Sequence, residues 1–202
     1  MGYTDGNRGD LMTLRTMISA LLAVALLAGL PAAATTMLRI DLPELAQGSD
    51  TVVHGTVRRT ESRWSADKRR IVTDVEIEVA ETLKGQAGNT VLVVQPGGRV
   101  GDIGQVVHGL ASFSEGEEVV VFLERRGTSA FRVMGMAQGK YQVRRSADDR
   151  SALAVPDNTG DALLLDPSTR QPSTTAQRTL TLDELKAAIK TALQQPGQEK
   201  RQ

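Results

Sequence analysis

The chain has no cysteine among its 202 residues. This excludes disulfides, thiolate zinc sites, a cysteine nucleophile and a lipid-bearing cysteine. The hydrophobic core is therefore expected to stabilise the fold without cross-links of that kind.

Aromatic residues are scarce, at 3% of the sequence, and 24 Lys and Arg balance 24 Asp and Glu. Zero net charge produces no overall field that would attract nucleic acid or an anionic membrane. Binding of single strands also needs aromatic side chains on which bases stack, and the few present are expected in the core. We interpret basic pairs such as Arg58-Arg59 as polar strand ends and expect no nucleic-acid partner.

The first 34 residues have the pattern of a signal peptide. Two arginines precede an apolar run at residues 17–30, and a small-x-small motif ends at Ala34. The run is shorter than the about 20 residues that a membrane-spanning helix needs. We expect translation from Met1 or Met12, cleavage after Ala34, export to the periplasm or beyond, and no membrane attachment afterwards.

Alternation of apolar and polar residues predicts a mainly β fold. The expected strands are residues 51–60, 71–83, 90–95, 119–123 and 131–143, with a short edge strand at 152–155. Polar residues between the first two strands predict a hairpin, and three glycines in the fifth suit bulges or bends. The fold class that fits best is a small five-stranded, OB-like antiparallel barrel over residues 35–157. A β-sandwich is the alternative.

The C-terminal part of the chain has a different composition. Residues 158–178 are rich in small and polar residues and are expected to be a linker or long loop. Thr181 and Glu184 then have the spacing of a capping box, in which each side chain binds a free backbone amide. An amphipathic C-terminal helix is predicted over residues 179–195, followed by a disordered tail over residues 196–202.

Three segments resemble a known family: Ser49-Asp50-Thr51-Val52-Val53-His54-Gly55-Thr56-Val57, Leu83-Lys84-Gly85, and Phe113 through Gly116-Glu117-Glu118-Val119. Their order resembles the OB-type barrel of netrin-like domains, which tissue inhibitors of metalloproteinases share. The resemblance spans residues 42–143. Exported bacterial proteins of unassigned function are more closely similar, around Gln95-Pro96-Gly97-Gly98 and Gln138-Gly139-Lys140.

The resemblance implies a barrel that binds a protein partner, with a secreted protease as one candidate. The inhibitors use an N-terminal cysteine to chelate the zinc of the protease. This chain has no cysteine, and its expected new terminus is Thr35. That inhibitory mechanism is therefore not expected.

The two histidines, His54 and His108, are the candidates for catalysis. A catalytic zinc usually has three protein ligands, and the sequence has no pair of histidines at helical i, i+4 spacing. His54 alternates with core positions, which is typical of a solvated or hydrogen-bonded strand histidine. A metal-dependent or other hydrolase using His54 or His108 is the alternative interpretation, while we expect no catalytic residue, metal or cofactor.

The glycine-rich segment at residues 97–104 is the first candidate for binding. It has neither the Walker spacing nor a dinucleotide motif, and loops of this kind connect strands or carry function. Arg99 and Asp102 lie within it, and His108 follows. The sequence therefore predicts an exported, non-enzymatic binding module whose site contains these three residues.

Overall fold

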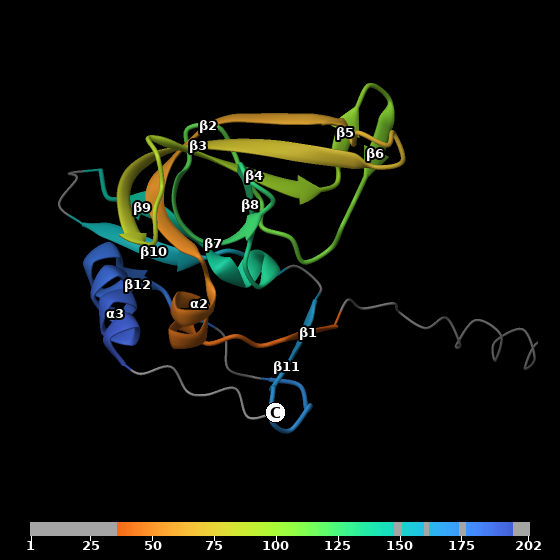
Figure 1. The fold of residues 1–202 in the computed structure, drawn as a ribbon. Coiled ribbons are helices and arrows are strands. Elements are labelled where there is room, and N and C mark those ends of the chain that lie inside the picture. Colours follow the sequence, from red (N-terminus) through yellow and green to blue (C-terminus); the bar gives the residue numbers. More distant parts are fainter. Residues whose placement is uncertain (1–35, 148–150, 160–161, 174–176, 196–202) are drawn as a thin grey trace, which may run out of the picture. The chain divides into compact units, whose positions relative to one another are not determined.

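The computed structural model describes residues 36–147, 151–159, 162–173 and 177–195 (Figure 1). All of these belong to one compact unit, Thr35–Gln202. The expected signal peptide and C-terminal tail lie outside the described residues. The described part is mainly β, and helix α3 (Leu182–Gln194) is its last element, as predicted.

The strands, in chain order, are β1 (Thr36–Leu38), β2 (Thr51–Trp64), β3 (Ile71–Lys84), β4 (Thr90–Pro96), β5 (Gly98–Val100), β6 (Ile103–Gln105), β7 (Glu118–Arg126), β8 (Ala130–Val133), β9 (Lys140–Arg145), β10 (Ala152–Pro156), β11 (Leu163–Leu165) and β12 (Leu180–Thr181). The remaining elements are helix α2 (Leu42–Gly48) and the 3-10 helix η1 (Met136–Gly139). The hairpin predicted between the first two long strands is confirmed, because β2 and β3 pair antiparallel along their whole length.

Eight strands form one sheet in the order β12-β10-β9-β7-β2-β3-β4-β8, and β8 also pairs with β7. Consequently β7, β2, β3, β4 and β8 each have a neighbour on both sides, while β9, β10 and β12 extend from β7. The β4–β8 contact, Val93 opposite Phe131, is parallel, whereas the other pairs in this sheet are antiparallel. The expectation of a purely antiparallel arrangement is therefore wrong at this one pair.

The prediction of one continuous strand over residues 131–143 is wrong. It is divided into β8 and β9 by η1, and both halves pair with the same strand, β7. Gly135 precedes η1 with a φ of 65°, a conformation that glycine adopts without a side-chain clash. Since apolar alternation continues on both sides of the interruption, the pattern could not reveal it.

Two short segments outside the main sheet also pair. Strand β11 lies in the stretch expected to be a linker or long loop, and it pairs in parallel with β1. Strand β10, at the predicted edge position, pairs with β9 on one side and with β12 on the other.

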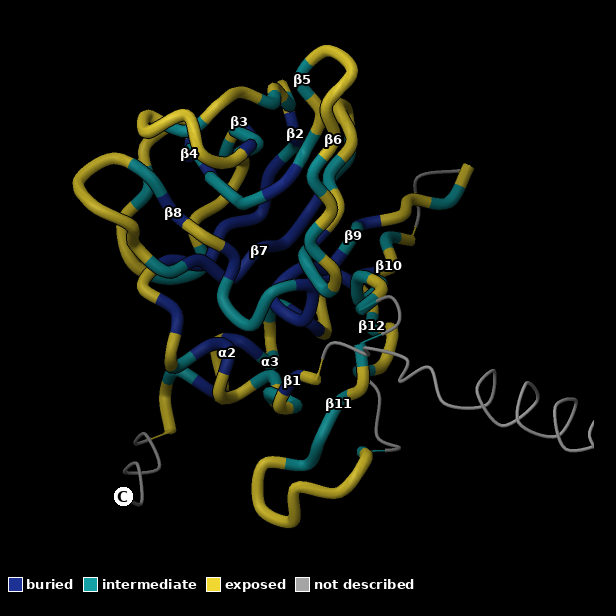
Figure 2. Tube along the Cα trace, turned by 90° about the vertical axis from the view of Figure 1, so that its right-hand side faces the viewer, coloured by how far each residue is buried: buried dark blue, intermediate teal, exposed yellow. Residues whose placement is uncertain are grey.

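Strands β2 and β7 send alternate side chains into two hydrophobic clusters. The strand cluster lies among the five mutually paired strands, and its buried members are Val53, Val57, Val75, Ile77, Val91, Val93, Ala111, Val119, Val121, Leu123, Phe131 and Val133. The helix cluster lies on the other face, and its buried members are Leu45, Ala46, Val52, Val120, Phe122, Tyr141, Val143, Ala154, Leu182, Leu185, Ile189 and Ala192. Figure 2 shows β7 buried along most of its length, as its place between the clusters requires.

Helix α3 begins with the predicted capping box. The Thr181 hydroxyl accepts the Glu184 N–H at 3.2 Å, and the Glu184 carboxylate accepts the Thr181 N–H at 2.8 Å. This backbone hydrogen bond lowers the pKa of Glu184. Among the described residues, no helix combines the length and apolar character needed to cross a membrane.

Candidate functional site

The glycine-rich candidate segment folds as a hairpin of β5 and β6. Gly98 pairs with Gln105, and Val100 pairs with Ile103 across the turn. Strands β2 and β3 together form a long two-stranded ribbon. Figure 1 shows the hairpin beside the end of this ribbon at which β2 ends and β3 begins. The segment that the sequence identified as a strand connection is thus a paired element of its own.

Hydrogen bonds from both sides of the hairpin attach it to the first residue of β3. The Ile71 N–H donates to Gln105 Oε1, and the Gly97 N–H donates to the Ile71 carbonyl, both at 2.9 Å. The side chain of Gln105 therefore fixes the hairpin to the ribbon in a single register.

Gly98 lies directly against the ribbon. Its φ is 124°, and a Cβ atom there would lie 2.2 Å from Ser62 Oγ and 2.4 Å from Thr73 Oγ1. Those two hydroxyl oxygens are 2.9 Å apart, and Thr73 also donates to the Gly97 carbonyl at 2.8 Å. The close approach of the β5–β6 hairpin to the β2–β3 ribbon requires glycine at this position.

The hairpin carries exposed apolar side chains next to charged ones. Ile103 is 56% exposed and Val106, just beyond β6, is 78% exposed. Arg99 and Asp102 are exposed on the same hairpin, whose turn is visibly exposed in Figure 2. We call Arg99, Asp102, Ile103 and Val106 the hairpin surface. Trp64, at the adjacent end of β2, is 38% exposed.

The three residues predicted for the site are only partly brought together. Arg99 and Asp102 share the hairpin, whereas His108 lies exposed in the segment that follows β6. Within the ranges that the structure describes, no hydrogen bond or ion pair joins any two of them. The apolar members, Ile103 and Val106, were missed because sequence patterns do not distinguish exposed apolar residues from buried ones.

His54 is hydrogen-bonded within the sheet, as expected for a strand histidine. It is 7% exposed, and its Nε2 lies 2.7 Å from Glu118 Oε1. Arg145 Nε and Nη2 each donate to the same carboxylate at 2.7 Å. These bonds lower the pKa of Glu118, with the Arg145 bond contributing most and the His54 bond less. In the described part of the chain, no group of three or more His, Asp or Glu side chains could hold a metal ion.

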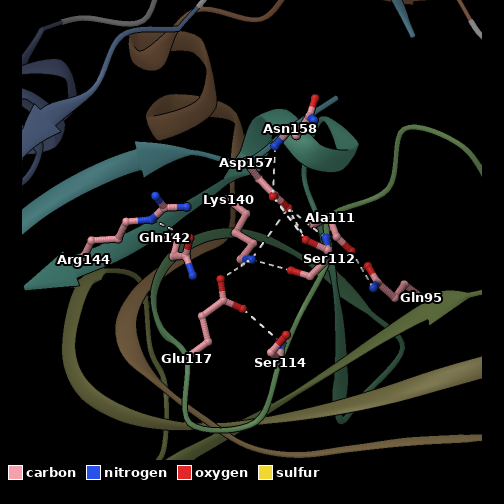
Figure 3. A network of polar contacts seen from close by, with 10 residues as sticks. All are labelled: Gln95, Ala111, Ser112, Ser114, Glu117, Lys140, Gln142, Arg144, Asp157 and Asn158. Carbon is pink, nitrogen blue, oxygen red and sulfur yellow. Dashed lines mark hydrogen bonds and ion pairs between the residues drawn. The ribbon is translucent and has the colours of Figure 1, made fainter. Parts of the chain in front are cut away.

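A buried lysine network lies where β9 begins (Figure 3). Lys140 is 1% exposed, and its ammonium group donates to the Ser112 carbonyl and, at 2.7 Å, to Glu117 Oε1. Asp157 Oδ2 lies 3.7 Å from the same nitrogen. The side chains of Glu117 and Asp157 are only 8% and 12% exposed, so two carboxylates face one ammonium in a nearly closed space.

The segment before β7 and the two residues that follow β10 complete this network. The Ser112 N–H donates to Asp157 Oδ2 at 2.8 Å, and the Asn158 N–H donates to Oδ1 at 3.0 Å. The Phe113 ring lies 4.9 Å from Lys140 Nζ. Alternation places Lys140 on the polar face of its strand, and no sequence spacing links it to partners in two distant segments. Sequence reasoning therefore missed the network.

Lys84 stabilises the end of helix α2. Its ammonium donates to the carbonyls of Ala46, Gln47 and Ser49 at 2.8, 2.7 and 2.6 Å. Burial lowers the pKa of Lys84. A cation at a helix C-terminus satisfies carbonyls that have no partner within the helix, which gives the Leu83-Lys84-Gly85 segment a structural role.

No family model matches the chain, and no curated protein is significantly similar to it. The resemblance to netrin-like domains therefore stays a prediction.

Proposed function

We propose that the chain is an exported, non-enzymatic binding module with an OB-like barrel, which binds a protein partner through the hairpin surface. The pairing of β8 with both β4 and β7 supports the barrel, because it gives all five central strands two neighbours. A parallel contact between the third and fifth of these strands in chain order is compatible with a small barrel that closes on itself.

The observation that carries the proposal is the exposure of Ile103 and Val106 on a fixed hairpin. Exposed apolar side chains surrounded by charged ones are typical of surfaces that bind proteins. Arg99 and Asp102 provide charges of both signs beside them, so a partner would have to complement both. Because the hairpin is already attached to the ribbon, little conformational entropy is lost when it binds.

A secreted protease is the partner class that the netrin-like resemblance favours. The hairpin would then occupy the active-site cleft of the protease as a rigid wedge. Zinc chelation by an N-terminal cysteine has no part in this proposal, since the chain has no cysteine.

The proposal is tested with the double variant Ile103→Ser/Val106→Ser. Full burial of one such side chain contributes about 1.5–3 kcal/mol, so the double variant should bind a captured exported partner at least about tenfold more weakly. The matched control is Leu153→Ser on β10, where Leu153 is 43% exposed. Equal binding by the wild type and the double variant would exclude the hairpin surface as the site.

A separate assay tests whether the partner is a secreted protease. The full chain is added to a panel of secreted metalloproteases and serine proteases, and residual peptidase activity is measured. Inhibition by the wild type and by Leu153→Ser, but not by the double variant, is the expected pattern. No inhibition across the panel would remove proteases as the partner class while leaving the binding assay to decide the broader proposal.

A further inference from the structure

The Lys140 network contains one cation and two carboxylates, so it holds one excess negative charge in a nearly closed space. Lys140 and Glu117 have side-chain exposures of 1% and 8%. Burying ions is costly because protein groups replace their hydration only in part. A reaction that converts a buried ion pair into a neutral group would remove that cost, and the three side chains are arranged for one.

The contacts of Lys140 Nζ suit a nucleophilic amine. A neutral amine has two N–H bonds and one lone pair. Two hydrogen bonds leave this nitrogen, one to the Ser112 carbonyl and one to Glu117 Oε1. Asp157 Oδ2 lies 3.7 Å away, beyond hydrogen-bond distance. Once the ammonium has lost one proton, these two hydrogen bonds would engage both remaining N–H bonds, and the lone pair would face the Asp157 carboxyl group.

The contacts of the Asp157 carboxyl group suit an electrophile. Its Oδ1 accepts the Asn158 N–H at 3.0 Å and the Ser112 hydroxyl at 3.2 Å, and its Oδ2 accepts the Ser112 N–H at 2.8 Å. Donors fixed on both oxygens stabilise the negative charge that develops on them when a nucleophile adds to the carbon. Oδ2 is the oxygen that lies 3.7 Å from Lys140 Nζ, so it is the one placed to receive protons from that side and leave.

The backbone holds the two reacting groups opposite each other. Strands β9 and β10 pair Tyr141 with Pro156, and the Asp157 N–H donates to the Lys140 carbonyl at 3.0 Å. Lys140 and Asp157 thus occupy the next cross-strand position, where facing side chains lie close together. Such fixed proximity replaces the entropy that an intermolecular reaction would lose.

We propose that Lys140 and Asp157 form an intramolecular isopeptide bond, with Glu117 as the proton-transfer residue. One proton of the Lys140 ammonium passes to Asp157 Oδ2, which leaves a neutral amine opposite a neutral carboxyl group. The lone pair of Nζ then adds to Cγ, and Glu117 takes a second proton from Nζ and returns it to Oδ2. The bond from Cγ to Oδ2 breaks, and Oδ2 departs with the two protons as one water molecule. Glu117 ends as the carboxylate it was at the start. The charges of the ammonium and the Asp157 carboxylate cancel, and no oxidant, reductant or co-reactant is needed.

The bond would cross-link the start of β9 to the residue that follows β10. Such a link reduces the conformational entropy of the unfolded chain, as a disulfide does. A chain without cysteine would thereby gain a covalent constraint that does not depend on the redox state of its surroundings.

Mass spectrometry of the denatured full chain tests the proposal. The expected intact mass is lower than the sequence mass by one water molecule. Lys140 should resist trypsin, so that residues 133–144 appear linked to residues 151–170. Lys84 should remain a free amine, because its partners are backbone carbonyls. A linear dehydrated peptide at Asp157-Asn158 would indicate a succinimide and overturn the proposal.

Three variants assign the roles. Asp157→Ala and Glu117→Gln are expected to have their full sequence masses. The first lacks the carboxyl carbon to which Lys140 would add, and the second lacks the carboxylate that transfers the proton. Glu115→Gln is the matched control, since that exposed carboxylate lies in the same segment and accepts the Thr60 N–H. It should retain the cross-link. A folded wild type with full mass, or a link from Lys140 to Glu117, would disprove the assignment.

Discussion

Tyr141 makes the stability of the protein sensitive to alkaline pH. It is 2% exposed, and burial raises the pKa of its phenol to about 12. A folded-state pKa above the unfolded value gives stability that is complete below the unfolded pKa, about 10, and is lost as the pH rises. From about pH 9 to about pH 11, this group alone should lower the free energy of unfolding by about 1 kcal/mol.

Urea unfolding of the wild type and Tyr141→Phe at a series of pH values measures this effect. Between about pH 9 and about pH 11 the wild type should lose about 1 kcal/mol more than the variant, because only the wild type has a phenol that ionises more readily in the unfolded state. Parallel pH curves for the two would show that Tyr141 ionises alike in the folded and unfolded states.

Individual buried polar residues were the part of the site that the sequence could not predict. Lys140 follows an alternation that places it on the polar face, yet it is buried because the segment containing Ser112 and Glu117 covers it. The sequence predicted that His54 is solvated or hydrogen-bonded. It could not identify the partner Glu118, because that contact depends on the register between β2 and β7. Such contacts are decided by tertiary pairing, which a single strand's pattern does not contain.

At the scale of elements, the start of α3 depends on one hydroxyl. Thr181→Ala removes the acceptor for the Glu184 N–H and should lower the free energy of unfolding by about 1 kcal/mol. Thr181→Ser keeps the hydroxyl and should stay close to the wild type. Chemical denaturation followed by circular dichroism measures both. A loss of equal size in the two variants would show that the methyl group, rather than the cap, matters.

The attachment of the β5–β6 hairpin depends on Gly98. Gly98→Ala places a Cβ atom against Ser62 and Thr73 at a positive φ, so we expect a loss of about 1–3 kcal/mol in the free energy of unfolding. Gly104→Ala on the opposite strand is the control, because its Cβ would have no atom within 4 Å. Hydrogen exchange at the Ile71 and Gly97 amides reports whether the hairpin has detached. Unchanged protection of these amides in Gly98→Ala would contradict the close packing.

The sequence predicted the existence of the strongest elements better than their ends. The period-two pattern identified β2 and β3, and the capping box identified the start of α3. Strand β2 nevertheless runs to Trp64 rather than to residue 60, because its pairing with β3 continues through polar residues. The break between β8 and β9 went unrecognised because both halves have strand patterns and pair with β7. The hairpin of β5 and β6 was missed for the opposite reason: glycine-rich strands have too few side chains to show alternation.

For the molecule as a whole, the two hydrophobic clusters share their central strands. Val120 and Val121 are neighbours on β7, and both are fully buried, but Val120 belongs to the helix cluster and Val121 to the strand cluster. If β7 loses its packing on one face, its backbone pairing is disturbed, and the side chains on its other face are displaced as well. We therefore expect the clusters to unfold together, as small single domains usually do.

The variants Val120→Ala and Val121→Ala test this coupling with the same chemical change on opposite faces. Each should lower the free energy of unfolding by about 1–3 kcal/mol. Trp64 fluorescence reports on the end of the β2–β3 ribbon, while far-ultraviolet circular dichroism reports on the helices and the sheet together. In both variants the two signals should change at the same denaturant concentration. If Val121→Ala shifted only the fluorescence transition, the clusters would be separate folding units, and β7 would not be the strand that couples them.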